Sequence, residues 1–384
     1  MSALLAVALL ATGCTSSSGE TVTVLDPRTD KPFVLTGVGN LTEIGQVTGV
    51  PGGTDAYAVH GTDLGSVFTA GDTTYLVFGD TFGERTAEQT GAGGSFWRSN
   101  VLGYTTDRDL SDGVRLTGMI TDETGLAKEL LDSKKVDGVE MTVIPTYGFA
   151  VGPNARAGSE DEGPTNGGTA GKTLYLYYMS VRHWGDPGRW DANHAGLARS
   201  TDGGQNWTRL EQTTWPGDSG FIQVSVAHVL EDGVDQLYFW AIPAGRFGGV
   251  RLMRVPAAQV EDPSAYRYYA GADSTGPIWA AERDRAVLIV DDTIGELSVA
   301  YNSYLDRWIM MYLREGDGVV LREGITPWGP WSEPRTVVDA AGHPGLYAPF
   351  QYPVTGEDGR RIYFNLSLWG PYNVFLYSID LEKS

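Results

Sequence analysis

The sequence predicts an all-β fold, specifically a five-bladed β-propeller, and three observations lead to that prediction. Beyond residue 30, short runs rich in Val, Tyr, Phe and Trp are separated by Gly, Asp, Asn and Pro, and few segments keep a helical period. Clusters of such runs recur at roughly 50- to 75-residue spacing, as successive blades would. A blade-turn motif lies at residues 200–207. A β-sandwich is the main alternative.

The strands are expected where apolar and polar residues alternate between turn residues. The clearest are, in chain order, 74–78, 173–180, 236–242, 250–255, 297–302, 308–313, 361–366 and 374–379. Pairing of the chain ends would close the ring of blades. No linker divides the chain, so residues 20–384 are predicted to form a single propeller domain.

Three segments depart from this pattern of strands. Residues 106–137 are expected to include a short helix around 125–131, and residues 256–269 another short helix. Residues 153–171 are polar, without apolar periodicity, and are predicted to be a mobile insertion.

The blade-turn motif is the stretch Ser200-Thr201-Asp202-Gly203-Gly204-Gln205-Asn206-Trp207, which matches the Asp-box pattern S-x-D-x-G-x-x-W. Such turns join outer strands of propeller blades. The motif therefore marks the fold and is interpreted as structural.

Composition narrows the class of partner. The 384 residues carry a formal net charge of −20, which argues against nucleic acid and anionic polymers and favours a neutral ligand. Eleven Trp and nineteen Tyr supply rings suited to sugars, although most aromatic residues in proteins serve the core. No nucleophile elbow or nucleotide-binding loop is present, which disfavours Ser or Cys hydrolase chemistry.

The sequence predicts no cofactor. The five histidines show no paired spacing typical of zinc sites, namely His60, His183, His194, His228 and His343. A structural calcium ion is left open.

The N-terminal segment resembles a bacterial lipoprotein signal. An apolar run from Leu4 ends at Cys14, the only cysteine, and a Ser-rich stretch follows. Cys14 would be the lipidated residue, and residues 1–19 the signal peptide and tether. No Lys or Arg precedes the run, so a plain signal peptide stays an alternative. Either reading predicts an extracytoplasmic protein, lipid-anchored to the membrane or secreted.

Asp63 and Asp80 are the strongest catalytic candidates. They flank a predicted hairpin whose turn is Gly71-Asp72, and an uninterrupted register would place them opposite each other on one sheet face. Like charges so close destabilise a sheet unless they are compensated or used. A bulge would shift the register and send the two side chains to opposite faces.

Two neighbouring carboxyl groups are what glycosidic hydrolysis requires. One acts as the acid at the leaving oxygen, and the other acts at the anomeric carbon. A separation of about 5–5.5 Å suits retention of configuration, whereas about 6.5–9.5 Å suits inversion. The predicted hairpin favours retention. The structural alternative is that each aspartate is ordinary turn chemistry at a strand end.

Further side chains are suited to binding sugar hydroxyls and rings. Two of them are carboxylates that interrupt apolar runs, and one is an arginine in a Gly-rich loop. The others are a second arginine, three amides and a tryptophan ring. These candidates are Arg98, Asn100, Glu140, Trp190, Asn193, Gln223, Arg246 and Glu296. The structural alternative for each of the two carboxylates is a solvated position at the end of a strand. The structural alternative for an arginine is an ion pair that only stabilises the fold.

Seven stretches, in order, resemble a known family. They are 61–65, 78–82, 141–145, 178–185, 243–249, 295–299 and 367–376. The family comprises actinobacterial five-bladed propellers long described as a domain of unknown function and since recognised as endo-D-arabinanases. The acidic stretch 159–162 departs from its pattern.

The resemblance implies retaining endo-hydrolysis of the α-D-arabinofuranosyl chains of arabinogalactan and lipoarabinomannan. Asp63 and Asp80 would be the nucleophile and acid/base pair, with Asp63 favoured as nucleophile. The expected partner is D-arabinan, with a membrane contacted only through a lipid anchor, and the protein is expected to be a monomer. Two other functions stay open: a non-catalytic glycan-binding propeller, and a sialidase-like enzyme suggested by the Asp box.

Overall fold

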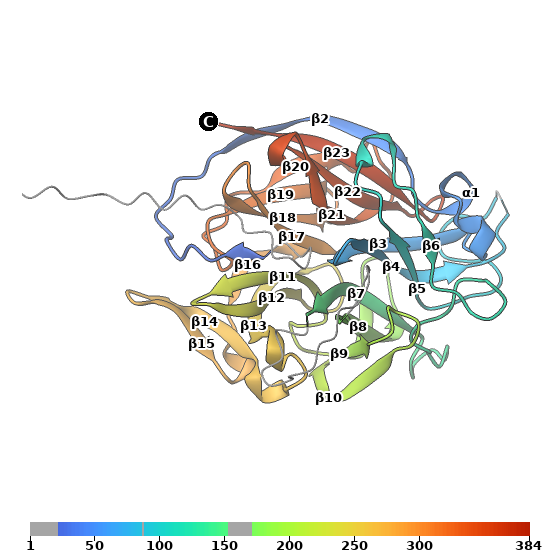
Figure 1. Ribbon diagram of the computed structural model, residues 1–384, viewed down its shortest axis with the longest axis horizontal. Coiled ribbons are helices and arrows are strands. Elements are labelled where there is room, and N and C mark those ends of the chain that lie inside the picture. Colours follow the sequence, from blue (N-terminus) through green and yellow to red (C-terminus); the bar gives the residue numbers. More distant parts are fainter. Residues whose placement is uncertain (1–21, 87, 153–170) are drawn as a thin grey trace, which may run out of the picture.

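The computed structural model describes residues 22–86, 88–152 and 171–384, and strands dominate these ranges (Figure 1). Four sheets have four strands each. They are β3 (Gly61–Ala70), β4 (Thr73–Phe82), β5 (Val101–Thr105) and β6 (Gly118–Met119); β7 (Thr142–Val151), β8 (Thr173–Trp184), β9 (Trp190–Ser200) and β10 (Thr208–Pro216); β17 (Leu297–Asn302), β18 (Arg307–Arg314), β19 (Gly318–Gly324) and β20 (Arg335–Asp339); and β2 (Leu35–Gln46), β23 (Asn373–Lys383), β22 (Arg361–Leu368) and β21 (Leu346–Gly356).

The remaining sheet is larger. It runs in the order β1 (Thr23–Val24), β11 (Gln223–Glu231), β12 (Val234–Ile242), β13 (Gly248–Pro256), β14 (Arg267–Asp273) and β15 (Gly276–Ala280), with β16 (Leu288–Ile294) also paired to β13. Helices are short: α1 (Gly49–Gly52) and the 3-10 turns η1 (Thr54–Tyr57), η2 (Leu110–Asp112), η4 (Ala257–Gln259), η5 (Pro263–Ala265), η6 (Arg283–Arg285) and η7 (Glu357–Gly359). No helix in the described ranges is long and apolar enough to cross a membrane.

The sheets are arranged as a propeller. The strands β3, β7, β11, β17 and β21 contact one another in that order, and β21 contacts β3 again, which closes a ring. Each of these strands except β11 is the edge of its own sheet, and β11 carries only the two-residue β1 beyond it. The predicted all-β propeller is therefore confirmed, with four regular four-stranded blades. The seven-stranded sheet departs from the expected regular repeat.

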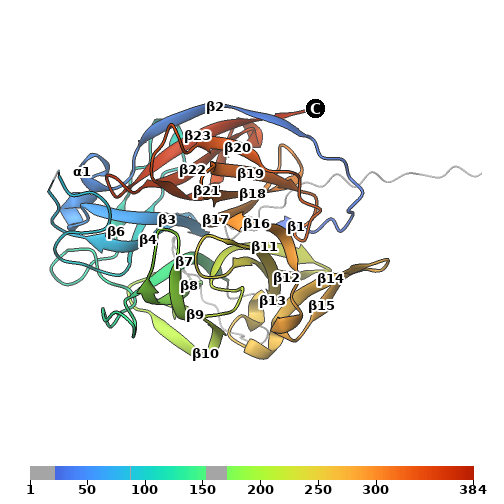
Figure 2. The same cartoon turned by 180° about the vertical axis from the view of Figure 1, so that it is seen from behind.

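Pairing between the two ends of the described chain closes the ring, as predicted. β2 runs antiparallel to β23, from Leu35 opposite Lys383 to Gln46 opposite Phe375, with three register shifts. Figures 1 and 2 show β2 lying along the outer edge of the sheet that carries β21 to β23. An early strand therefore completes the last sheet.

The expected strands are confirmed, since all eight predicted runs lie inside β4, β8, β12, β13, β17, β18, β22 and β23. The helix expected around residues 125–131 is wrong. That segment is irregular and is held by backbone bonds such as Ala127 N to Tyr57 O at 3.0 Å. The expected helix within 256–269 exists as η4 and η5. Residues 1–19, with Cys14, and the insertion at 153–170 lie outside the described residues.

The Asp box forms the turn between β9 and β10, as predicted. Asp202 Oδ1 accepts bonds from the Ser200 hydroxyl at 2.7 Å and from Asn206 N at 3.0 Å, and Trp207 Nε1 donates to Gly204 O at 2.8 Å. The turn is closed by its own side chains, and its role is structural.

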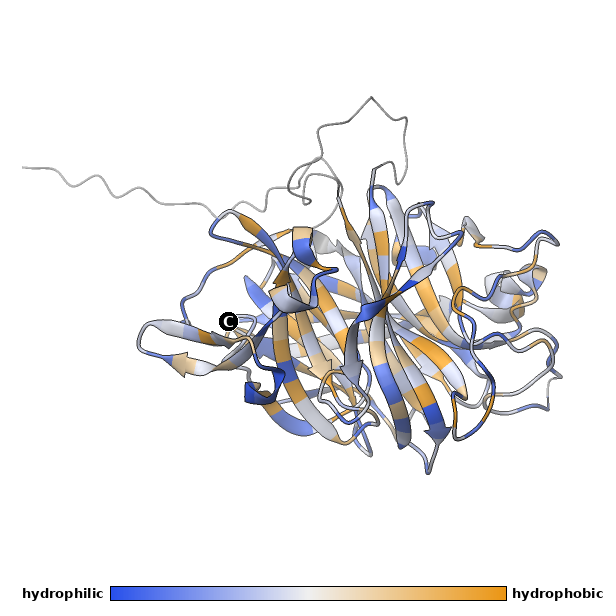
Figure 3. Ribbon diagram, turned by 90° about the horizontal axis from the view of Figure 1, so that it is seen from below, coloured by the Kyte–Doolittle hydropathy of each residue, from blue (hydrophilic) through white to orange (hydrophobic). Residues whose placement is uncertain are grey.

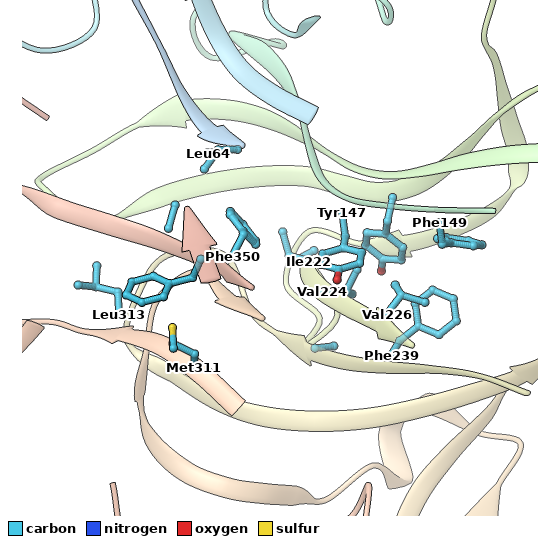
Figure 4. Packing of buried hydrophobic residues seen from close by; sticks show 14 of the residues in the cluster. Leu64, Tyr147, Phe149, Ile222, Val224, Val226, Phe239, Met311, Leu313 and Phe350 are labelled. Carbon is cyan, nitrogen blue, oxygen red and sulfur yellow. The ribbon is translucent and has the colours of Figure 1, made fainter. Parts of the chain in front are cut away.

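Aromatic and aliphatic side chains fill the space between the sheets. Bands of apolar and polar residues alternate along the strands in Figure 3, as period-2 burial requires. The largest apolar cluster joins residues of several sheets, among them Leu64, Phe239, Met311 and Phe350, seen together in Figure 4. Burying one such side chain contributes about 1.5–3 kcal/mol. This core forms the base on which the site is built.

Candidate active site

The strands β3, β7, β11, β17 and β21 that form the ring are the inner strands of the propeller. A cavity of about 730 Å³ lies where they meet, and residues of all five sheets line it. Its floor is apolar, with Leu64, Val224 and Phe350, which belong to the core cluster of Figure 4. Asp63 and Asp80 both line the cavity. An apolar pocket with a few convergent polar groups is the usual form of a ligand site.

The hairpin that carries the two aspartates forms nearly as predicted. Its register starts from Thr69 opposite Thr74 and returns to the predicted alignment at Thr62 opposite Thr81. Between those pairs the register shifts twice, and Leu64 pairs with Phe78. The expected direct pairing of Asp63 with Asp80 is therefore corrected to a bulged arrangement. Both side chains still line one cavity, because the two shifts cancel.

The bulge depends on particular backbone positions. Leu64 and Gly65 have φ of 67° and 74°, in the left-handed region, which is unfavourable for a leucine. A Cβ at position 79 would lie 2.5 Å from Asp63 Oδ1, so only glycine fits at Gly79. Bulges next to active sites re-aim side chains, and here the bulge brings the Asp63 carboxyl against the opposite strand.

Asp63 is held by two tyrosines of the sheet that closes the ring. The Tyr347 hydroxyl donates to Asp63 Oδ2 at 2.9 Å, and the Tyr372 hydroxyl also bonds this carboxyl. Burial, followed by the charge of Asp80, raises the pKa of Asp63 to about 7, and the Glu296 charge acts in the same direction. Asp63 therefore holds a proton near neutral pH, which a free aspartate does not.

Asp80 is more fully buried and lies in a more polar setting, at 7% exposure. Its Oδ1 accepts from Trp97 Nε1 at 2.8 Å and from the Thr142 hydroxyl at 2.6 Å. Burial raises its pKa to about 6, while these two donors favour the charged form. Trp97 is in turn stacked on Phe82, with ring centroids 6.3 Å apart. The two carboxyl groups thus have different donors, tyrosine hydroxyls at Asp63 and an indole and a threonine hydroxyl at Asp80.

A third carboxylate, that of Glu296, also lines the cavity. Glu296 is 7% exposed and accepts from Arg246 through Nε at 3.1 Å and Nη2 at 2.9 Å. The Arg246 guanidinium also lies 5.0 Å from the ring centroid of Tyr347. The predicted candidates Arg246 and Glu296 are therefore brought into the same cavity as the aspartates, as an ion pair.

Two exposed indoles belong to the cavity lining. Trp184, 38% exposed, ends β8, and Trp369, 51% exposed, follows β22. Their sheets lie on either side of the sheet that carries Asp63 and Asp80, because β3 contacts both β7 and β21. Both neighbouring sheets therefore contribute an exposed indole to the cavity that the aspartates line.

The other sequence candidates are divided by the structure. Trp190 and Gln223 line the cavity. Four do not. Arg98 donates to the carbonyls of Ala58 and Ala127, and Asn100 bonds backbone groups of residues 130, 131 and 143, so both fix loops inside the protein.

Glu140 and Asn193 also lie outside the cavity lining. Glu140 accepts from Ser180 at 2.8 Å and faces a different hollow, which Arg209 shares. Asn193 donates to Val139 O at 2.7 Å. Both side chains are engaged in joining neighbouring segments of β7 to β9 and the preceding loop.

Sequence reasoning gave no role to Tyr347, Tyr372, Thr142 or Trp369. A buried tyrosine in a strand is usually core, and Tyr347 carries no local signal of its contact with Asp63. Tyr372 and Trp369 lie in the stretch 367–376 used for the family resemblance, which was the available signal. No group of three or more His, Cys, Asp or Glu within the described ranges is placed to hold a metal ion.

A model of the family described as "Domain of unknown function (DUF4185)" matches residues 50–378. The chain belongs to the DUF4185 family. The match includes both aspartates and agrees with the first part of the resemblance seen in the sequence, the domain of unknown function.

Two curated proteins are similar to part of this DUF4185 chain. Notoamide biosynthesis cluster protein J of Aspergillus sp. (strain MF297-2) is 30% identical over 199 residues, 50% of this chain and 51% of that protein. Protein J' of Aspergillus versicolor is 31% identical over 185 residues, 47% and 49% of the two chains. The chain thus spans about half the length of the curated relatives it matches.

Solved structures share the fold of this DUF4185 protein. A "putative hydrolase" from Bacteroides ovatus ATCC 8483 superimposes with a TM-score of 0.51 at 13% identity, covering 85% of this chain and 87% of the other. A GH43_1 enzyme from Xanthomonas citri gives 0.46 at 12% identity, covering 85% and 88%. The likeness to the Bacteroides ovatus protein concerns the fold alone.

Proposed function

We propose that this protein is a retaining, endo-acting glycoside hydrolase that cleaves α-D-arabinofuranosyl linkages in the D-arabinan of arabinogalactan and lipoarabinomannan. The observation that carries the proposal is the pair Asp63 and Asp80, two carboxyl groups with raised pKa values that line one cavity. Perturbed carboxyls in a concave pocket are the usual mark of acid and base catalysis. The substrate class comes from the sequence resemblance.

The two environments support different roles for the two aspartates. Asp63 has the higher pKa, about 7, and keeps a proton for the leaving oxygen. Asp80 has the lower pKa, about 6, and its Oδ1 is already held by Trp97 and Thr142, which orients Oδ2 as nucleophile. We therefore favour Asp63 as acid/base, the reverse of the assignment favoured from the sequence.

The reaction then takes two steps. Asp80 Oδ2 bonds to the anomeric carbon while the glycosidic C–O bond breaks, and Asp63 gives its proton to the departing oxygen. Water next attacks the anomeric carbon, Asp63 takes a proton from that water, and the ester bond to Asp80 breaks. The product keeps the configuration of the substrate, and both carboxyl groups return to their starting protonation.

The surroundings favour a neutral polymer over a small charged substrate. The net charge of −20 disfavours anionic chains, whereas arabinan is uncharged. Trp184 and Trp369, exposed indoles from the two sheets next to that of the aspartates, line the same cavity, where sugars beyond the cleaved bond would stack. Such contacts beyond the cleaved bond are what cleavage within a chain needs.

The finer predictions of architecture and setting belong to this proposal. We infer that the seven-stranded sheet serves as the fifth blade, since β11 completes the ring of inner strands. The proposed enzyme needs no cofactor, contacts the membrane only through a lipid at Cys14 or is secreted, and works as an extracytoplasmic monomer on polysaccharide, with no nucleic acid partner.

A glycan-binding propeller without catalysis is the competing function. It would use the same cavity and aromatic rings, but it has no need for two carboxyls of raised pKa side by side. A sialidase-like enzyme is disfavoured, because only Arg189 and Arg246 are arginines in the described cavity lining, and Arg246 is paired with Glu296.

The test is release of oligosaccharides from purified mycobacterial arabinogalactan by the protein and by Asp63→Asn and Asp80→Asn. Asp72→Asn is the matched control, since Asp72 lies in the turn of the same hairpin with a side chain 91% exposed. The proposal expects oligosaccharides from the parent and the control only. Binding without release by the parent would favour the glycan-binding function.

A further inference from the structure

Glu296 carries a buried oxygen that nothing in the described protein satisfies. Its Oε1 takes both bonds from Arg246, while Oε2 is buried and has no hydrogen-bond partner among the described residues. A buried carboxylate oxygen left unpaired costs about 1–3 kcal/mol or more, so such an atom calls for an explanation.

The position of this oxygen suggests what satisfies it. Glu296 lines the same cavity as Asp63 and Asp80, and its charge acts on Asp63. Arg246, which holds Glu296, packs against the ring of Tyr347, and Tyr347 holds Asp63. Glu296 is thus fixed relative to the reacting centre by a short chain of contacts.

We propose that Oε2 of Glu296 accepts a hydrogen bond from a hydroxyl of the sugar whose anomeric carbon lies between Asp63 and Asp80. Glu296 thereby determines which sugar is cleaved. This inference rests on the proposed glycosidase function and names a specificity-determining residue for it. Arg246 comes from the loop 243–247 between β12 and β13, and Glu296 immediately precedes β17.

A neutral hydroxyl fits this oxygen better than a cation does. Arg246 already balances the Glu296 charge, and its Nη1 also lies 3.9 Å from Glu315. A hydroxyl brings a donor without a further charge to bury. A charged acceptor also discriminates strongly, because a substrate that lacks the hydroxyl leaves the oxygen unpaired.

Glu296 also affects the proton on Asp63. The groups that face Asp63 are Asp80 on β4, Tyr347 on β21, Tyr372 ahead of β23, and Glu296 ahead of β17. Of these, the negative charges of Asp80 and Glu296 raise the pKa of Asp63, and the tyrosine hydroxyls lower it. Neutralising Glu296 should therefore lower the pKa at which Asp63 loses its proton.

The experiment compares Glu296→Gln with the parent on arabino-oligosaccharides and on synthetic analogues that each lack one hydroxyl of the sugar at the cleaved bond. We expect Glu296→Gln to reduce kcat/KM about 10- to 100-fold on the natural substrate. On the analogue that lacks the hydroxyl bound by Glu296, kcat/KM of the variant and of the parent should be nearly equal. The alkaline limb of the pH profile should move to lower pH.

Glu231→Gln is the matched control. Glu231 is also a part-buried glutamate paired with an arginine, Arg254, which packs 4.1 Å from the ring centroid of Trp279, outside the cavity lining. The control should keep parental kcat/KM. Thermal unfolding of both variants, followed by circular dichroism, separates loss of recognition from loss of fold.

Three results would overturn the inference. They are parental activity of Glu296→Gln, an equal loss on every analogue, and a complete loss matching Asp63→Asn, which would make Glu296 a catalytic acid itself. Failure of the proposed function looks different, because the parent would then release no oligosaccharide from arabinan at all.

Discussion

Tyr347 donates its hydroxyl to Asp63 across the joint between two sheets, with an oxygen-to-oxygen distance of 2.9 Å and 284 positions of sequence between them. Tyr347 lies on β21 and Asp63 on β3, the last and first members of the ring of inner strands. Closure of the propeller through β2 and β23 therefore places the donor against the carboxyl. Assembly of the fold and orientation of Asp63 are one event.

The pH dependence of activity should be bell-shaped and narrow. Asp80 must be charged to attack, so activity falls as the pH drops below about 6, and Asp63 must be protonated, so activity falls as the pH rises above about 7. Initial rates of reducing-end release between pH 4 and 9 measure both limbs. A plateau extending to pH 9 would contradict Asp63 as the acid.

Asp63→Asn should stabilise the folded protein. The pKa of Asp63 is raised from 3.8 to about 7, so the folded state binds this proton more tightly, and its ionisation costs stability as the pH rises from about 4 to 7. Asparagine removes that cost. The rise of about 3 in pKa corresponds to a gain of at most about 4 kcal/mol at pH 8 and almost none at pH 4. Urea unfolding at both pH values tests the sign, and a loss at pH 8 would refute it.

Trp369→Ala should weaken polymer binding more than turnover. The indole is 51% exposed in the cavity lining and meets Tyr372 edge-on, with centroids 5.7 Å apart. We expect KM for arabinan to rise about 3- to 10-fold with little change in kcat. Ile278→Ala is the control, because Ile278 is an exposed apolar residue of β15 outside the cavity lining. An unchanged KM would remove Trp369 from the binding surface.

Arg98→Met should destabilise the fold without affecting substrate affinity. Arg98 is 3% exposed, burial lowers its pKa to about 10, and its guanidinium donates to backbone carbonyls of Ala58 and Ala127. Losing these charged bonds should cost about 2–4 kcal/mol. Denaturant unfolding measures the cost, and KM of the folded fraction should match the parent. A raised KM at normal stability would return Arg98 to the binding site.

The fold was readable from the sequence because propeller strands are local features. In runs such as 236–242 and 374–379, apolar and polar residues alternate, and turn residues bound each run. The Asp box is closed by hydrogen bonds of its own side chains. The irregular segment around 125–131 was misread, since its apolar residues Ala127, Leu130 and Leu131 are buried by contacts with distant segments and not by a helical face.

The site was readable only in part. Asp63 and Asp80 are joined by one hairpin, so local pairing was enough to bring them together, whereas the bulge at Leu64 and Gly65 was not predictable from alternation. Arg98 and Asn100 were predicted to bind substrate but lie outside the cavity lining. The sequence does not distinguish a polar residue that faces a ligand from one that bonds a backbone carbonyl. Their partners lie about 30 to 40 residues away in the sequence.

The anomeric configuration of the first product addresses the paired carboxyls directly. Proton NMR during the first minutes of arabino-oligosaccharide hydrolysis should show the α-anomer appearing first, because Asp80 and Asp63 act through a covalent intermediate. With Asp63→Asn and with Asp80→Asn, no product signals should appear in the spectra, while Asp72→Asn should give the same product signals as the parent. Hydrolysis at the parental rate by either variant would contradict the account, and a β-anomer formed first by the parent would contradict its retaining mechanism.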